Sequence, residues 1–147
     1  MLEEKCTIIL LTYLEDNGWE ILCFDYPQSG TGRVLHPDSN MSKTEGSIIP
    51  DIVAVKGDVC LFFENKGYYF PPDFDKQNML RTTSDYKTSI NELIDGKYVR
   101  HIYYGIGLPA DSSIHVTDDD KKKVDFIVSV EDDETVNVFY STFGLVF

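Results

Sequence analysis

The segment IIPDIVAVKGDVCLFFENKG, from Ile48 to Gly67, decides the fold because it keeps charged residues inside a mostly apolar run. Ile, Val, Leu and Phe dominate the segment, and this composition is typical of strands at the centre of a sheet. A charge is costly in such a place unless it is paired or used. The presence of Asp51, Glu64 and Lys66 therefore makes this segment the first candidate for a functional site.

A turn at Gly57-Asp58 divides the segment into the two strands of a predicted hairpin. A two-residue connection of this kind closes tight hairpins. If Lys56 and Val59 flank the turn, counting outward along both strands sets Asp51 directly opposite Glu64. Directly opposed side chains share one face of a sheet and lie about 5 Å apart at Cβ.

The two faces of the predicted hairpin differ. Strand periodicity puts Lys66 on the same face as Glu64. The opposite face is wholly apolar and carries Ile52, Ala54, Leu61 and Phe63. Two adjacent carboxylates repel each other unless a cation lies between them, so a divalent metal would resolve the conflict.

The same residues carry a resemblance. Pro50-Asp51, an apolar strand and then Glu64-Asn65-Lys66 resemble the PD-(D/E)XK signature of the restriction-endonuclease-like superfamily. The resemblance implies an α/β fold with an αβββαβ core, in which helices flank a central mixed sheet in three layers. It also implies hydrolysis of DNA phosphodiester bonds with Mg²⁺, or Mn²⁺ in its place.

The resemblance also implies roles for individual residues. Asp51 and Glu64 resemble the metal ligands, the main-chain carbonyl of Asn65 is a further candidate ligand, and Lys66 resembles the catalytic lysine. Water would attack the phosphorus in line while Lys66 orients or activates it.

Many members of the family add a glutamate from the first helix. Glu3, Glu4 and Glu15 are all available, and we prefer Glu4 because it lies at the start of the helix, away from the acidic end at Glu15-Asp16.

The order of helix, Gly-Trp, strand, Ser-Gly and Pro-Asp is also similar to archaeal Holliday-junction resolvases and small type II restriction enzymes. Ser29 is then a candidate phosphate contact. Other residues are candidate DNA contacts by their type or by their place in the loop that begins at Ser29: Thr31, Arg33, Lys43, Lys76, Gln77, Arg81 and Lys87. Each of them also fits an ordinary solvated surface position.

The remaining sequence predicts one domain over residues 1–147. We expect a helix at 2–16 and one broken helix or two short ones at 74–94, with Ser84 capping the second part. Further strands are expected at 19–26, 97–108, 124–130 and 135–143. The connections include a long loop at 27–47, an aromatic, proline-containing turn at 68–77 and a charged turn at 118–123.

The distribution of charge along the chain bears on whether the protein could bind DNA. The net charge is −12, which opposes phosphate binding. The acidity lies at the two ends, because residues 33–100 carry nine basic and ten acidic side chains. A DNA-binding middle, with the protein acting as a homodimer, is one reading. A catalytically silent relative or an acidic interaction protein is the other.

Cysteine and histidine usage points to no zinc site or disulfide. The three cysteines, Cys6, Cys23 and Cys60, each lie among apolar neighbours and are expected to be buried free thiols. No apolar run is long enough to span a membrane, and no cleavage site follows the acidic start, so a cytoplasmic location is the default expectation.

Overall fold

A computed structural model describes residues 1–26, 29–39, 46–145 and 147. Its helices are α1 (Glu3–Asp16), α2 (Pro71–Thr82), α3 (Lys87–Leu93) and α4 (Asp118–Lys121), with a 3₁₀ turn, η1, at Ala110–His115. Its strands are β1 (Glu20–Phe24), β2 (Ile52–Lys56), β3 (Val59–Asn65), β4 (His101–Pro109), β5 (Phe126–Val130) and β6 (Val136–Ser141).

The strands form one mixed sheet in the order β1-β2-β3-β4-β5-β6. Neighbours β1–β2, β2–β3 and β5–β6 are antiparallel, whereas β3–β4 and β4–β5 are parallel. Parallel neighbours require a crossover connection, and α2 with α3 supplies the first one. The α/β expectation is therefore confirmed at the level of a mixed sheet with helices.

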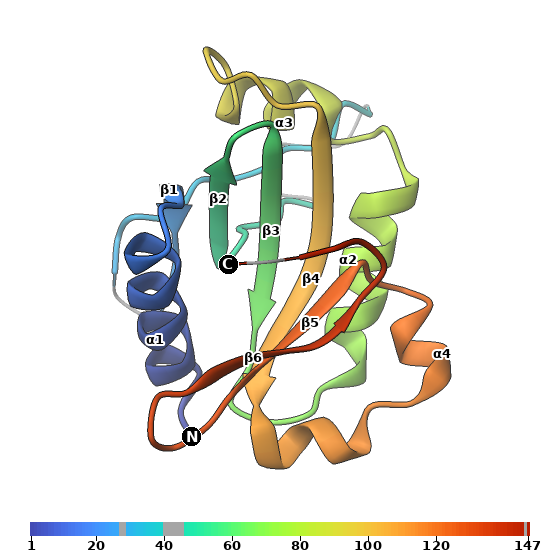
Figure 1. Cartoon of the computed structure of the whole chain (residues 1–147). Coiled ribbons are helices and arrows are strands. Elements are labelled where there is room, and N and C mark those ends of the chain that lie inside the picture. The colour runs from blue at the N-terminus through green and yellow to red at the C-terminus, as the bar shows by residue number, and fades with distance from the viewer. Residues whose placement is uncertain (27–28, 40–45, 146) are drawn as a thin grey trace.

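Helices cover both faces of the sheet (Figure 1). On one face, α1 packs through Leu10 and Leu14 against β2 and β3, where Leu61 and Phe63 are buried. On the other face, α2 and α3 pack against the alternate residues of the same two strands, including Phe62. The hairpin is thus buried on both sides, as its composition predicted.

The hairpin has the predicted register. Lys56 pairs with Val59, and Ile52 pairs with Phe63 at the far end. The turn depends on Gly57, whose φ of 59° lies in the left-handed region that favours glycine. Of the two turn residues only Gly57 has a positive φ, which fits a turn with glycine at its first central position.

The first helix follows its sequence signals closely. It begins with Glu3 and Glu4 in the first turn, where acidic side chains stabilise the helix dipole. It ends before Gly18, whose φ is 85°.

Three local predictions need correction. Helix α2 begins at Pro71, inside the predicted turn, because proline is tolerated in the first turn of a helix, where no backbone N–H bond is required. Tyr86, rather than Ser84, is the residue that precedes α3, and the cap has no side-chain hydrogen bond. The charged turn contains the short helix α4, which Thr117 and Asp120 cap reciprocally.

The carboxyl end of β3 meets the start of the chain (Figure 1). A Cβ atom on Gly67 would lie 2.2 Å from the Met1 carbonyl oxygen, so only glycine permits this approach. The first turn of α1 is thereby brought to the end of the hairpin where the charged residues lie. The three cysteines are buried free thiols, as expected. Among the described residues, no helix combines the length and the apolar character needed to cross a bilayer.

Candidate active site

Asp51 and Glu64 lie side by side at the open end of the hairpin. The backbone N–H of Asp51 donates to the Phe63 carbonyl at 3.1 Å, one residue out of the register in which Ile52 pairs with Phe63. The Asp51 carboxylate in turn accepts a 2.6 Å hydrogen bond from the backbone N–H of Asn65. The predicted register therefore holds from Lys56–Val59 to Ile52–Phe63 and is offset by one residue at Asp51, whose carboxylate still lies close enough to Glu64 for the two charges to interact.

Both carboxylates are buried. Asp51 is 9% exposed and Glu64 is 6% exposed. Burial and the nearby charge of Glu64 raise the pKa of Asp51 to about 8, although the Asn65 N–H opposes the shift. Burial also raises the pKa of Glu64, against the opposing effect of Lys76. The protein alone therefore supplies too little positive charge to balance two ionised carboxylates at this place.

Lys76 enters the site from α2. Its Nζ atom lies 3.1 Å from Oε1 of Glu64, and the contact is both an ion pair and a hydrogen bond. The sequence suggested Lys76 as a DNA contact by type alone. In the structure, its ammonium group is the direct ionic partner of a predicted metal ligand.

Lys66 lies at the same end of the sheet. Its Nζ atom is 3.4 Å from Oε1 of Glu3 and 5.1 Å from the centre of the Phe70 ring. Burial lowers the pKa of Lys66, but the charges of Asp73 and Glu3 outweigh this effect and the pKa is raised. Lys66 is therefore held as a cation.

Of the three glutamates weighed in the first helix, the structure brings Glu3 to Lys66. Glu4 is exposed and lines a different hollow with Leu2 and Ile8. Glu15 lies in the last turn of α1, at the other end of the helix. The preference for Glu4 rested on its place in the first turn, and the neighbouring position is the one that faces the site.

Asp73 is a site residue that sequence reasoning missed. It lies in the first turn of α2 and is 6% exposed. Burial and then the charge of Glu64 raise its pKa to about 7. A signal was available, because Pro71-Pro72 marks a helix start and the spacing of Asp73 to Lys76 then places both residues on one helix face.

The side chain of Asn65 points away from the carboxylates. Its amide nitrogen donates to Thr7 of α1 at 3.2 Å, and its Oδ1 atom is buried without a hydrogen-bond partner. A Cβ atom on Gly107 would lie 2.4 Å from that oxygen, so the amide is closely packed between the sheet and α1. Any role for Asn65 as a metal ligand therefore falls to its main-chain carbonyl.

The loop after β1 starts beside Asp51. The backbone N–H of Asp25 donates to the Asp51 carbonyl at 2.8 Å. In this loop Thr31 donates to the Phe24 carbonyl at 2.7 Å, and Ser29 accepts from the Tyr26 backbone at 3.3 Å. These two candidate DNA contacts stabilise the loop.

Other candidate DNA contacts have different surroundings. Arg33 and Lys87 are exposed, and Lys43 lies outside the described residues. Arg81 pairs with Asp125 at 3.2 Å and also donates to the Lys122 carbonyl, so it ties α2 to the segment before β5.

Gln77 is the clearest departure from the expected DNA contacts. It is 2% exposed, and its amide nitrogen donates to the carbonyls of Phe62 at 3.0 Å and Gly105 at 2.7 Å. Gln77 therefore attaches α2 to β3 and β4 and is not presented to a ligand surface. The reason is tertiary, because Gln77 lies on the sheet-facing side of its helix.

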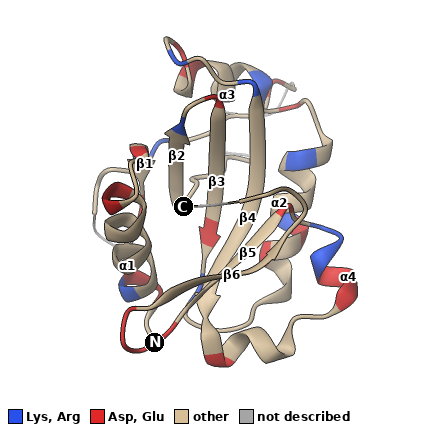
Figure 2. Cartoon of the chain, in the orientation of Figure 1, with Lys and Arg blue, Asp and Glu red and all other residues tan. Residues whose placement is uncertain are grey.

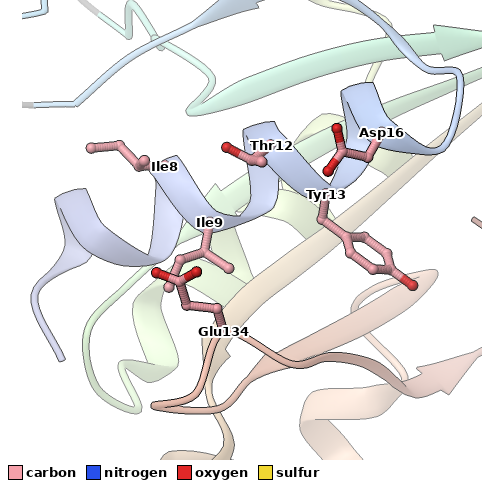
Figure 3. A pocket seen from close by; sticks show the side chains of 6 residues that line it. All are labelled: Ile8, Ile9, Thr12, Tyr13, Asp16 and Glu134. Carbon is pink, nitrogen blue, oxygen red and sulfur yellow. The ribbon is translucent and has the colours of Figure 1, made fainter.

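A hollow elsewhere on the protein does not share this chemistry. It runs along α1 and is lined by Ile8, Ile9, Thr12, Tyr13, Asp16 and Glu134 (Figure 3). None of its lining residues is basic, and none belongs to the predicted site. Acidic segments also occupy α4 and the turn between β5 and β6 (Figure 2).

Comparisons with known proteins add no family assignment. Models of known protein families give no match to the chain, and curated proteins give none either. Within residues 1–26, 29–39, 46–145 and 147, no group of three or more His, Cys, Asp and Glu side chains is arranged to hold a metal ion. The candidate site therefore consists of two neighbouring carboxylates and two lysines: Asp51, Glu64, Lys66 and Lys76.

Proposed function

We propose that the protein is a metal-dependent DNA endonuclease of the PD-(D/E)XK type. The observation that carries the proposal is that the Asp51 and Glu64 carboxylates lie close together at the end of a buried hairpin, with the Lys66 ammonium at the same end. These are the residue types, in the order along the chain, that the resemblance implies: Asp51 directly before β2, Glu64 within β3 and Lys66 directly after it.

The topology supports the same proposal. The chain runs α1-β1-β2-β3, then α2, and then β4, with α1 and α2 on opposite faces of the sheet. This is the αβββαβ order that the resemblance implies. We infer a restriction-endonuclease-like core, to which β5 and β6 are added at one edge.

The donor set fits a hard divalent cation. Mg²⁺ is bound by oxygen ligands and commonly takes only one or two carboxylates while keeping several waters. Asp51 and Glu64 supply two carboxylates whose raised pKa values reflect burial without enough positive charge. The main-chain carbonyl of Asn65 is the further proposed ligand, and Mn²⁺ suits the same oxygens.

When bound, Mg²⁺ or Mn²⁺ would polarise the phosphate and lower the pKa of an attacking water. Lys66 would orient that water and stabilise the negative charge that develops on the phosphate oxygens. The new P–O bond would form as the ester P–O bond breaks; the attacking water would give up one proton to solvent, and the leaving oxygen would take one proton from solvent. Glu3 acts as a positioning residue, since it holds the Lys66 ammonium at 3.4 Å.

DNA is the proposed substrate, and a homodimer is the proposed form. Two cuts in a duplex require two sites, and two-fold symmetry supplies them. The terminal strands or the aromatic segment before α2 would form the interface. A junction-resolving nuclease recognises DNA structure and a restriction enzyme recognises DNA sequence, and the same proposed chemistry serves both, so both remain within the proposal.

One observation favours a second candidate, an acidic interaction protein without catalysis. The net charge is −12, and Glu64 is already paired with Lys76. Such a protein would bind neither a divalent metal at Asp51 nor DNA.

A cleavage assay tests the proposal. The protein is incubated with supercoiled plasmid, linear duplex and a four-way junction, in Mg²⁺, Mn²⁺ or EDTA. We expect metal-dependent cleavage that is lost in Lys66→Ala and kept in Lys97→Ala, a control that removes a surface pair with Glu20. Absence of cleavage on every substrate, or equal cleavage by Lys66→Ala, would contradict the proposal. Calorimetry of Mn²⁺ binding to the protein and to Asp51→Ala then identifies the silent alternative, which shows no binding to lose.

A further inference from the structure

Lys76 occupies the place of a counter-ion at the proposed metal site. Its Nζ atom lies 3.1 Å from a Glu64 side chain that is only 8% exposed, while the Lys76 side chain itself is 32% exposed. A divalent cation that binds Glu64 would bring a second positive charge to the same carboxylate. Like charges repel at this distance, so the ion pair and the metal compete for Glu64.

A second carboxylate is available to Lys76 on its own helix. Asp73 precedes Lys76 by three residues, and side chains at this spacing are neighbours on a helix surface. Asp73 is 6% exposed, and within the described parts of the chain no hydrogen bond or ion pair engages its carboxylate. A buried carboxylate in this state is costly, and a nearby cation would relieve the cost.

Lys76 is the cation that a metal at Glu64 would displace, and Asp73 is within its reach. The charges of both lysines act on Asp73, that of Lys66 more strongly than that of Lys76. Lys66 is already paired with Glu3 and stacked over Phe70. Lysine carries its charge on a flexible four-carbon stem, so a shift of the Lys76 ammonium needs no movement of the helix.

We propose that Lys76 is a movable counter-ion, which pairs with Glu64 when no metal is bound and with Asp73 when a divalent cation binds Asp51 and Glu64. The inference rests on the proposed function, because it assumes a metal at those two carboxylates. Metal binding then includes the displacement of the Lys76 ammonium from Glu64, which lowers the affinity for the metal. Removing Lys76 should strengthen metal binding, and removing the Asp73 charge should weaken it.

The test is calorimetry of Mn²⁺ binding at pH 8 without DNA, so that no cleavage intervenes. The proteins are wild type, Lys76→Gln, Asp73→Asn and the double variant. Matched controls are Lys123→Gln and Asp75→Asn, which remove the same charges from an exposed pair, 2.7 Å long, that also involves α2. Urea unfolding and circular dichroism in EDTA verify that each variant is folded.

We expect Lys76→Gln to bind Mn²⁺ about tenfold more tightly and Asp73→Asn about fivefold more weakly, which are the sizes expected for breaking one partly buried ion pair. In the Lys76→Gln background, Asp73→Asn should then change the affinity no more than Asp75→Asn does. This loss of effect is what distinguishes a partner of Lys76 from a metal ligand.

Each other outcome has a distinct meaning. Unchanged affinity in Lys76→Gln, with normal binding by wild type, overturns the movable counter-ion and leaves the proposed function intact. Weakening by Asp73→Asn that persists without Lys76 overturns it too, because Asp73 would then act on the metal directly. Mn²⁺ binding by Lys76→Gln, with no detectable binding by the wild type, supports the inference. No binding by any variant overturns both this inference and the proposed function.

Discussion

The metal-free protein should lose stability as the pH rises from 5 to 7, and Asp51→Asn should remove much of that loss. Asparagine has nearly the shape of aspartate, and its side-chain oxygen still accepts the hydrogen bond from the Asn65 N–H. The substitution therefore removes the ionisable group while it keeps the local bonding. What changes is the pH dependence of the free energy of unfolding.

The sign and size follow from the two pKa values of Asp51. In the folded protein the pKa is about 8, and its ordinary value in an unfolded chain is 3.8. Between these values the folded state holds a proton that the unfolded state has released, so folding becomes less favourable as the pH rises. The loss is about 1.4 kcal/mol per pH unit, or about 3 kcal/mol from pH 5 to pH 7. Asp73, whose folded pKa is about 7, adds to the wild-type slope in the same direction.

The assay is urea unfolding in EDTA at pH 5, 6 and 7. Trp19, the single tryptophan, is 5% exposed and reports unfolding by fluorescence. The control is Asp58→Asn, in the turn at the other end of the hairpin. We expect the Asp51→Asn profile to be flatter than the wild-type profile by about 3 kcal/mol over this range. Parallel profiles for the two proteins, or a wild type that gains stability toward pH 7, would contradict a raised pKa of Asp51 in the folded protein.

Three further predictions concern individual residues. Lys66→Ala should lower cleavage about a hundredfold, the size typical of losing a group that stabilises developing charge, while calorimetry shows Mn²⁺ still bound. Gln77→Ala should cost about 2–3 kcal/mol in urea unfolding because two buried carbonyls lose their donor, and a loss under about 0.5 kcal/mol would contradict the packing role. Gly105→Ala should cost about 1–3 kcal/mol because its Cβ would lie 2.3 Å from the Phe126 ring; Phe126→Leu, which shortens that side chain, should recover part of the loss if the clash is its cause.

The hairpin could be predicted because its signals are local. Alternation along the strands and the Gly57-Asp58 turn together determine the register, and the register brings Asp51 and Glu64 to the same end of the hairpin. Most predicted strands also lie near the observed ones, because a short apolar run between turn residues indicates a strand without tertiary context. Helix ends were predicted less well, since α2 begins at Pro71, inside the segment that was expected to be a turn.

The rest of the site depends on contacts between segments far apart in the chain. Lys76 reaches Glu64 only because α2 packs across the sheet, and Gln77 is buried by the same packing. Glu3 rather than Glu4 faces Lys66 because the start of α1 approaches Gly67. Neither the rotation of a helix about its axis nor its docking position can be read from residue spacing when several polar side chains compete for the buried face.

Anomalous diffraction from a crystal of the protein soaked in Mn²⁺ would locate a metal ion at Asp51 and Glu64 directly. We expect a manganese peak bonded to the carboxylates of Asp51 and Glu64, with the Lys76 ammonium withdrawn from Glu64. A fully soaked crystal with no manganese at these two residues, and the Lys76–Glu64 pair still closed, would contradict this expectation.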